Sequence, residues 1–137
     1  MTEHAGRPSR GVDAVRHARH LRLEDIGHEG QARLSAASVA VVGAGGLGCP
    51  VLLYLAAAGV GRLTIIDDDV VSLSNLQRQV IYRTEDIGRS KSEVAAERLL
   101  ALDPGLEVHT HVARLHPGNA LGLLKGHNLV IDGTDLI

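Results

Sequence analysis

The sequence predicts an α/β fold, a Rossmann-like parallel sheet with helices on both faces, preceded by a short helical arm. Three observations predict this fold. Short β-branched runs alternate with stretches of helical periodicity, a glycine-rich motif directly follows the first run, and the second run ends in three aspartates. Strands that alternate with helices are typical of a parallel sheet with right-handed crossovers. We expect the sheet to be incomplete, as the N-terminal half of a larger fold.

Local patterns predict the individual elements. Residues 38–42 form a β-branched run that stops at glycine, as a buried strand does. Apolar residues at helical spacing then predict a helix over residues 47–58, ended by Gly59. The further strands are expected at residues 63–66, 106–112 and 129–131, and the further helices at residues 90–102 and 120–124.

The chain divides into three regions. Residues 1–15 are polar and contain glycine, proline and serine, so we expect a disordered tail. Residues 16–37 have sparse apolar positions and are expected to form an arm of short helices, broken near Gly27. Residues 38–137 are expected to form a nucleotide-binding domain that is truncated at its C-terminal end.

Composition excludes several classes of function. The chain of 137 residues has a formal net charge of −2 and no Phe or Trp, which argues against general nucleic-acid binding and base stacking. Cys49 is the only cysteine, so neither an internal disulfide nor an all-cysteine zinc site is possible, and a reducing cytoplasm fits best. No run approaches the roughly 20 apolar residues that span a bilayer, so we expect no membrane association.

The glycine motif predicts a phosphate-binding turn. Gly43, Gly45 and Gly48 form G-x-G-x-x-G between a predicted strand and a predicted helix, and Gly46 adds further room. The backbone can approach a phosphate there, and the helix N-terminus offers unpaired N–H groups. Asp67 follows at the end of the second strand, where an acidic side chain meets ribose hydroxyls. These features indicate a nucleotide, ATP or NAD, although a plain tight turn would also account for the glycines.

Charged residues favour ATP over NAD. A triphosphate attacked at its α-phosphorus needs cationic side chains and usually a metal, whereas the pyrophosphate of a dinucleotide is neutralised mostly by backbone. Arg78 and Lys91 could supply those cations, or could be a solvated loop arginine and a helix-start lysine. Asp132 and Asp135 follow the last predicted strand, where a carboxylate can hold Mg²⁺ or cap a turn.

Two further candidates favour a structural interpretation. His109 and His111 share one face of a strand but have no third metal ligand, so we expect an exposed pair. Cys49 lies early in a helix, where we expect a small buried packing residue rather than a reactive thiolate.

With these residues placed, the chain resembles the MoeB/ThiF family of the ubiquitin-activating-enzyme superfamily from about residue 16 to residue 135. The resemblance rests on VVGAGGLGCP, on LTIIDDDVVSLSNLQRQ and on Lys91. In that family ATP adenylates the C-terminal glycine of a ubiquitin-like protein, as in thiamine or molybdopterin synthesis. The resemblance therefore implies an adenylyltransferase that uses ATP and Mg²⁺ and acts on a ubiquitin-like sulfur-carrier protein.

The resemblance also implies roles for individual residues. Gly46 would approach the phosphates, Asp67 the ribose and Asp135 the Mg²⁺. Arg19 resembles the N-terminal arginine that reaches the partner's site in the family, which implies a homodimer. The nucleotide-binding residues are then expected to be Gly43, Gly45, Gly46, Gly48, Asp67, Asp69, Ser74, Asn75, Arg78 and Lys91.

The chain departs from the family pattern at residues 16–20, RHARH in place of Arg-Tyr-x-Arg-Gln, and at Leu136, which replaces an asparagine. The family's zinc-binding cysteine pairs and carrier-docking surface would lie beyond Ile137, so zinc is expected only in that C-terminal half. Two alternatives stay open. The first alternative is an NAD-dependent dehydrogenase domain. The second is a truncated family member that binds nucleotide without catalysis.

Overall fold

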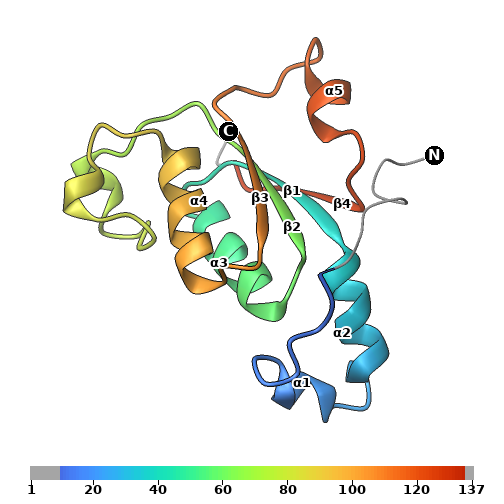
Figure 1. Ribbon diagram of the computed structural model, residues 1–137. Coiled ribbons are helices and arrows are strands. Elements are labelled where there is room, and N and C mark those ends of the chain that lie inside the picture. Colours follow the sequence, from blue (N-terminus) through green and yellow to red (C-terminus); the bar gives the residue numbers. More distant parts are fainter. Residues whose placement is uncertain (1–9, 135–137) are drawn as a thin grey trace.

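The computed structural model describes residues 10–134 and has a parallel four-stranded sheet at its centre (Figure 1). The strands are β1 (Ser38–Val42), β2 (Arg62–Ile66), β3 (Glu107–His111) and β4 (Leu129–Asp132), in the order β3-β2-β1-β4. The helices are α1 (Ala18–Leu21), α2 (Gly27–Ala36), α3 (Gly48–Ala58), α4 (Lys91–Leu102) and α5 (Ala120–Leu124). The predicted strands and helices are all present, and the arm breaks between α1 and α2 as expected.

The strand order places the first strand in the middle of the sheet. β1 pairs in parallel with β2 on one side and with β4 on the other. Helices α3 and α4, which connect β1 to β2 and β2 to β3, lie together on one face (Figure 1). Thr64 points to the opposite face from its neighbours in β2, and its hydroxyl bonds to His127 Nε2 at 2.8 Å. The connection that contains α5 therefore reaches the second face.

The main core lies between the sheet and α3 and α4, and it is built from aliphatic side chains. Burial of each Val, Leu or Ile side chain stabilises the folded state by roughly 1.5–3 kcal/mol. Aliphatic side chains can therefore stabilise this core without Phe or Trp. None of the described helices is both long and apolar enough to cross a membrane. The buried members of this core include Val39, Val41, Leu52, Leu63, Ile65, Val94 and Leu99.

The expected tail, residues 1–15, falls partly outside the described residues, which begin at Arg10. The Arg10 guanidinium forms a two-point salt bridge with Asp103, at 2.9 and 2.6 Å. The Ser35 hydroxyl also donates to the Gly11 carbonyl at 2.9 Å. Arg10 and Gly11 thus have contacts with residues distant in sequence, which a local polar pattern does not reveal.

Candidate nucleotide-binding site

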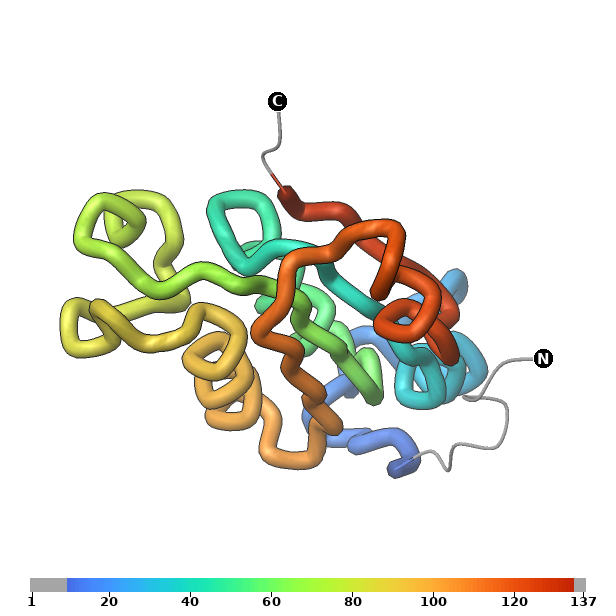
Figure 2. The backbone as a smooth tube through the Cα atoms, turned by 90° about the horizontal axis from the view of Figure 1, so that it is seen from above, coloured from blue at the N-terminus to red at the C-terminus, as the bar shows by residue number. Residues whose placement is uncertain are grey.

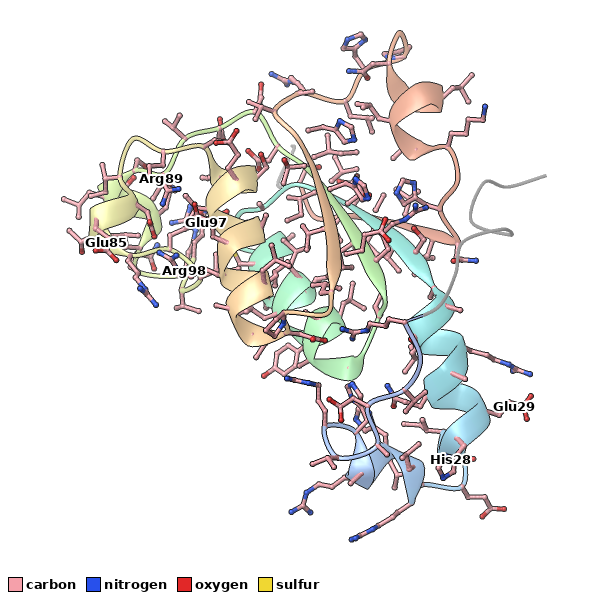
Figure 3. The ribbon with its side chains drawn as sticks, viewed as in Figure 1. His28, Glu29, Glu85, Arg89, Glu97 and Arg98 are labelled. Atoms are coloured by element: carbon pink, nitrogen blue, oxygen red, sulfur yellow. The ribbon has the colours of Figure 1, made fainter. Side chains whose placement is uncertain are left out.

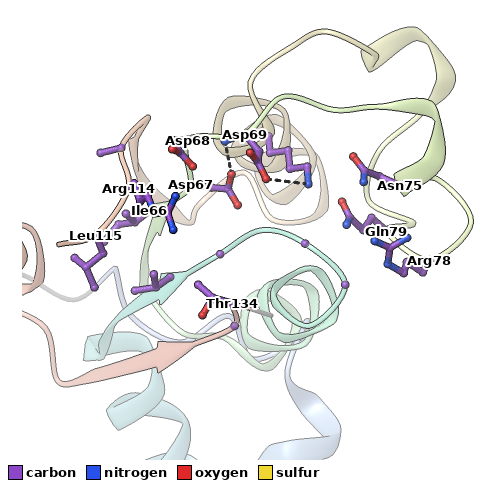
Figure 4. Close-up of a pocket in the computed structure, with 17 residues that line it drawn as sticks. Ile66, Asp67, Asp68, Asp69, Asn75, Arg78, Gln79, Arg114, Leu115 and Thr134 are labelled. Atoms are coloured by element: carbon purple, nitrogen blue, oxygen red, sulfur yellow. Dashed lines mark hydrogen bonds and ion pairs between the residues drawn. The ribbon is translucent and has the colours of Figure 1, made fainter. Parts of the chain in front are cut away.

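A pocket of about 350 Å³ opens at the carboxyl end of the sheet (Figure 4). Ligands of open parallel sheets gather at this edge, at the point where the strand order reverses. Here the reversal lies between β1 and β4, which run on either side of the glycine-rich turn. The lining residues are Val42, Gly43, Gly45, Gly46, Ile66, Asp67, Asp68, Asp69, Asn75, Arg78, Gln79, Lys91, Ala113, Arg114, Leu115, Gly133 and Thr134.

The glycine loop, residues 43–48, has a shape that only glycine permits at two positions. Gly43 has φ 97°, in the left-handed region, and a Cβ there would lie 3.0 Å from the carbonyl of Gly133. A Cβ on Gly48 would overlap the carbonyl oxygen of Gly43. Figure 2 shows this loop beside the end of β4. The loop can therefore expose Gly45 and Gly46 to the pocket, as the motif predicts.

The Asp67 carboxylate holds the glycine loop to the end of β2. One oxygen accepts the N–H of Ala44 at 2.7 Å, and the other accepts the N–H of Asp69 at 2.7 Å. Each carboxylate oxygen has a second lone pair, so Asp67 can still accept a hydroxyl from a ligand in the pocket.

Two cationic side chains reach the pocket from different elements. Arg78 follows the short 3-10 turn η2 (Leu73–Asn75), and a Cβ on Gly46 would lie 3.5 Å from its Nε. Lys91 is the first residue of α4, is buried, and has its Nζ 3.8 Å from a carboxylate oxygen of Asp69. The pocket thus has two positive charges beside the glycine loop and carboxylates at the end of β2, as a nucleotide with several phosphates requires.

The two polar residues expected beside Arg78 differ in position. Asn75 lines the pocket, and its Oδ1 accepts the backbone N–H and the hydroxyl of Ser72, both at 2.9 Å. Its amide nitrogen remains available to a ligand. Ser74 is exposed and does not line the pocket; its hydroxyl lies 3.3 Å from that of Ser72.

A buried carboxylate braces the segment that carries Arg78 against α4. Asp86 accepts the N–H of Arg83 at 2.8 Å, and the guanidinium groups of Arg98 at 2.6 Å and Arg89 at 3.3 Å. Arg89 also pairs with Glu97, so four charged side chains join the loop to the helix (Figure 3). Burial by itself raises the pKa of Asp86, but the Arg83 N–H and the Arg98 guanidinium outweigh it, and the pKa is lowered.

Of the predicted site residues that the structure describes, three do not line the pocket, namely Gly48, Ser74 and Arg19. Arg19 is exposed in α1 and does not line the pocket. Asp135 lies outside the described residues. Asp132 is exposed and accepts the N–H and hydroxyl of Thr134, at 3.0 and 2.6 Å, as a turn-capping residue does. The Thr134 hydroxyl bond lowers the pKa of Asp132.

The remaining candidates agree with the expectation only in part, because His111 is half-buried and the two histidines are not an exposed pair. His109 is exposed, and its Nε2 lies 2.7 Å from Glu107. Cys49 is buried, its thiol donates to the Ala44 carbonyl at 3.3 Å, and burial raises its pKa to about 11. Within residues 10–134, the one group of three side chains that could together hold a metal ion is Asp67, Asp68 and Asp69.

Sequence reasoning missed several lining residues. Gln79 stands next to Arg78, and its burial depends on how the loop folds back onto the glycine loop. Arg114 and Leu115 follow β3, so the rule that ligands gather at the carboxyl ends of strands could have found them. Thr134 comes after the end of β4, so the same rule could have found it.

Comparison of the sequence with protein families and known proteins finds relatives over most of its length. The profile of the ThiF family matches residues 17–137. A probable adenylyltransferase/sulfurtransferase, MoeZ, of Mycobacterium tuberculosis is 53% identical over 123 residues, which cover 90% of this chain and 31% of MoeZ. A sulfur carrier protein adenylyltransferase of Thermus thermophilus is 52% identical over 120 residues, which cover 88% of this chain and 44% of that protein.

A solved structure has the same fold. The tRNA N6-threonylcarbamoyladenosine dehydratase TcdA of E. coli, crystallised with ATP, superposes with a TM-score of 0.85 and 31% identity. The match covers 90% of this chain and 51% of TcdA. The chain thus spans about a third to a half of the length of these relatives.

Proposed function

Because the chain belongs to the ThiF family, we propose that it carries the nucleotide-binding part of an enzyme that adenylates the C-terminal glycine of a ubiquitin-like sulfur-carrier protein. One observation carries the proposal. Arg78 and Lys91 enter the pocket beside the glycine loop from two different elements. The adenylyltransferase names of the two relatives support the reaction class, and the name of the Thermus thermophilus protein supports the partner.

The proposed reaction joins a carboxylate to AMP. A carboxylate oxygen of the terminal glycine attacks the α-phosphorus of ATP, a new oxygen–phosphorus bond forms, and the bond to the pyrophosphate oxygen breaks. The products are an acyl-adenylate and pyrophosphate. Negative charge grows on the leaving pyrophosphate, so side chains that complement it lower the barrier. Arg78 and Lys91 take this role, while Asp67 binds the ribose and Asn75 the nucleotide.

Mg²⁺ accompanies ATP in this proposal, with Asp135 as its ligand. A divalent cation neutralises phosphate charge during phosphoryl transfer and prefers oxygen ligands. The carboxylates of Asp68 and Asp69, which line the pocket, suit that chemistry. Zinc is proposed only for a segment beyond residue 137, because Cys49 is the one cysteine of this chain. A reducing cytoplasm is the proposed location for the same reason.

Arg19 is proposed to act in a second copy of the chain, which makes the enzyme a homodimer. It belongs to α1, at the opposite end of the molecule from the carboxyl end of the sheet (Figure 1). Subunits extended by the C-terminal half of a relative allow a test. Mixing Arg19→Ala subunits with Lys91→Ala subunits leaves one intact composite site in each heterodimer, so part of the activity should return. Proven heterodimers without rescue would place Arg19 in its own subunit's site or outside any site.

Nucleotide choice separates this proposal from an NAD-dependent dehydrogenase domain. The glycine loop and Asp67 suit either nucleotide, but a triphosphate uses both Arg78 and Lys91. Calorimetric titration of the chain should therefore give at least about tenfold tighter binding of ATP with Mg²⁺ than of NAD, the gain from one charged hydrogen bond. Equal or tighter binding of NAD would overturn the proposal.

The same chain tests the second alternative, a family member that binds nucleotide without catalysis. We expect the 137-residue chain alone to bind ATP but to give no pyrophosphate exchange with a sulfur carrier. Holding the reacting carboxylate in line can be worth roughly 7–11 kcal/mol of barrier, and we propose that the surface for the carrier lies beyond residue 137. Exchange by this chain alone would show that the catalytic part lies within it.

A further inference from the structure

Gln79 has a buried side chain whose amide has no partner in the described part of the chain. The chain has three glutamines, and two of them are buried, Gln31 at 1% and Gln79 at 3% exposure. The Gln31 amide is satisfied at both ends, because its Nε2 donates to the Ala58 carbonyl at 2.8 Å and its Oε1 lies 3.0 Å from His20 Nδ1. The Gln79 Oε1 is buried with no hydrogen-bond partner.

The position of Gln79 sets it beside the glycine loop. A Cβ on Gly45 would lie 3.4 Å from Gln79 Nε2, just as a Cβ on Gly46 would lie 3.5 Å from Arg78 Nε. Two successive side chains thus lie against two successive glycines. Figure 4 shows Gln79 next to Arg78 and Asn75 on the wall of the pocket that faces the glycine loop.

Packing alone does not explain an amide at this position. A buried polar atom without a partner destabilises the folded state, whereas an apolar side chain of similar shape does not. Methionine would fill a similar volume without leaving an unpaired oxygen. The unpaired Oε1 makes an amide costly here, which points to a role for the other end of the amide. Nε2 lies beside Gly45 and next to the cation of Arg78, where it can donate to a ligand in the pocket.

We propose that Gln79 is a further ligand-contacting residue whose Nε2 donates to a phosphate oxygen of the bound nucleotide, next to Gly45. An amide offers two donors without adding charge, so it complements Arg78 and Lys91, which neutralise the phosphates. This inference rests on the proposed function, because it assumes a nucleotide whose phosphates lie at the glycine loop.

The test compares ATP with adenosine, which has the same base and ribose but no phosphate. Gln79→Met should weaken ATP binding about tenfold, as expected for loss of one hydrogen bond to a charged group, and should leave adenosine binding unchanged. Gln79→Glu should weaken ATP binding further, because a carboxylate next to the phosphates repels them. Gln77→Met, an exposed neighbour outside the pocket, should bind ATP as the wild type does.

Thermal unfolding without nucleotide supplies the second measurement. Gln31→Met loses two satisfied hydrogen bonds and should lower the melting temperature, whereas Gln79→Met should not. The proposal is overturned if Gln79→Met binds ATP as tightly as the wild type, if it loses ATP and adenosine binding equally, or if it fails to fold. A wild-type chain that binds no ATP would instead remove the proposed function itself.

Discussion

Asp86 links the stability of the fold to the shape of the pocket, and Asp86→Asn tests this link. The substitution places an amide nitrogen where one carboxylate oxygen accepts the Arg83 N–H and the Arg98 guanidinium, or where the other accepts Arg89. Removing one partner from a buried ion pair costs about 3–5 kcal/mol. Because Arg98 and Arg89 keep 18% and 44% of their side chains exposed, we expect a loss of about 2–3 kcal/mol in unfolding free energy.

Differential scanning calorimetry measures this loss. For a domain of this size it lowers the melting temperature by about 10 °C. ATP binding should weaken in parallel, because Asp86 holds the segment that carries Asn75 and Arg78. The control is Glu97→Gln, which removes a half-exposed partner of Arg89 and should cost less than about 1 kcal/mol. An Asp86→Asn protein that melts within about 1 °C of the wild type would refute the reasoning.

The pH dependence of the same variant is a further check. The folded-state pKa of Asp86 is lowered, so its stabilising contribution is present above the unfolded value of about 3.9. The contribution is lost as the pH falls through the lower, folded-state pKa. The difference in melting temperature between wild type and Asp86→Asn should therefore narrow below pH 4. A difference that stays constant down to pH 2 would contradict the assignment.

Three other predictions concern the site, the N-terminal segment and the buried thiol. In a chain extended by the C-terminal half of a relative, Arg78→Ala and Lys91→Ala should each reduce carrier-dependent pyrophosphate exchange about 10²-fold; normal exchange with normal melting temperatures would exclude both from the mechanism. The Arg10 guanidinium lowers the pKa of Asp103, so protease cleavage near Arg10 should increase as the pH falls below about 4, and cleavage already high at pH 7 would contradict this. Burial raises the Cys49 pKa to about 11, so iodoacetamide at pH 8 should alkylate it only after unfolding, and rapid alkylation of the folded chain would contradict its burial.

Local patterns predicted the elements because hydrophobic periodicity and glycine stops act over a few residues. The helix expected over residues 47–58 is observed as α3 (Gly48–Ala58), and Gly59 ends it with φ 101° in the left-handed region. The parallel direction of the strands also followed from the alternation of strands and helices, whereas the strand order did not. The contact of Arg10 with Asp103 could not be predicted, because the two residues are distant in sequence.

The candidate site was predictable where a motif carries the chemistry. Three glycines of the glycine loop, Gly43, Gly45 and Gly46, line the pocket, as do Asp67, Arg78 and Lys91. Gln79 was not predictable, since only the packing of the loop against Gly45 decides whether a glutamine next to an arginine is buried or solvated. Arg114 belongs to a connection with no periodicity, so its position depends on where β3 lies in the sheet.

The close approach of three glycine backbones has a consequence for synthesis of the protein. Gly43 and Gly48 belong to the first strand–helix turn, and Gly133 belongs to the end of the last strand, with its N–H donating to the Val42 carbonyl at 2.7 Å. The turn therefore obtains its full set of contacts only when residue 133 has left the ribosome. The nascent chain can form α3 and pair β1 with β2 earlier, but its glycine loop gains the contacts with Gly133 only after β4 has been made.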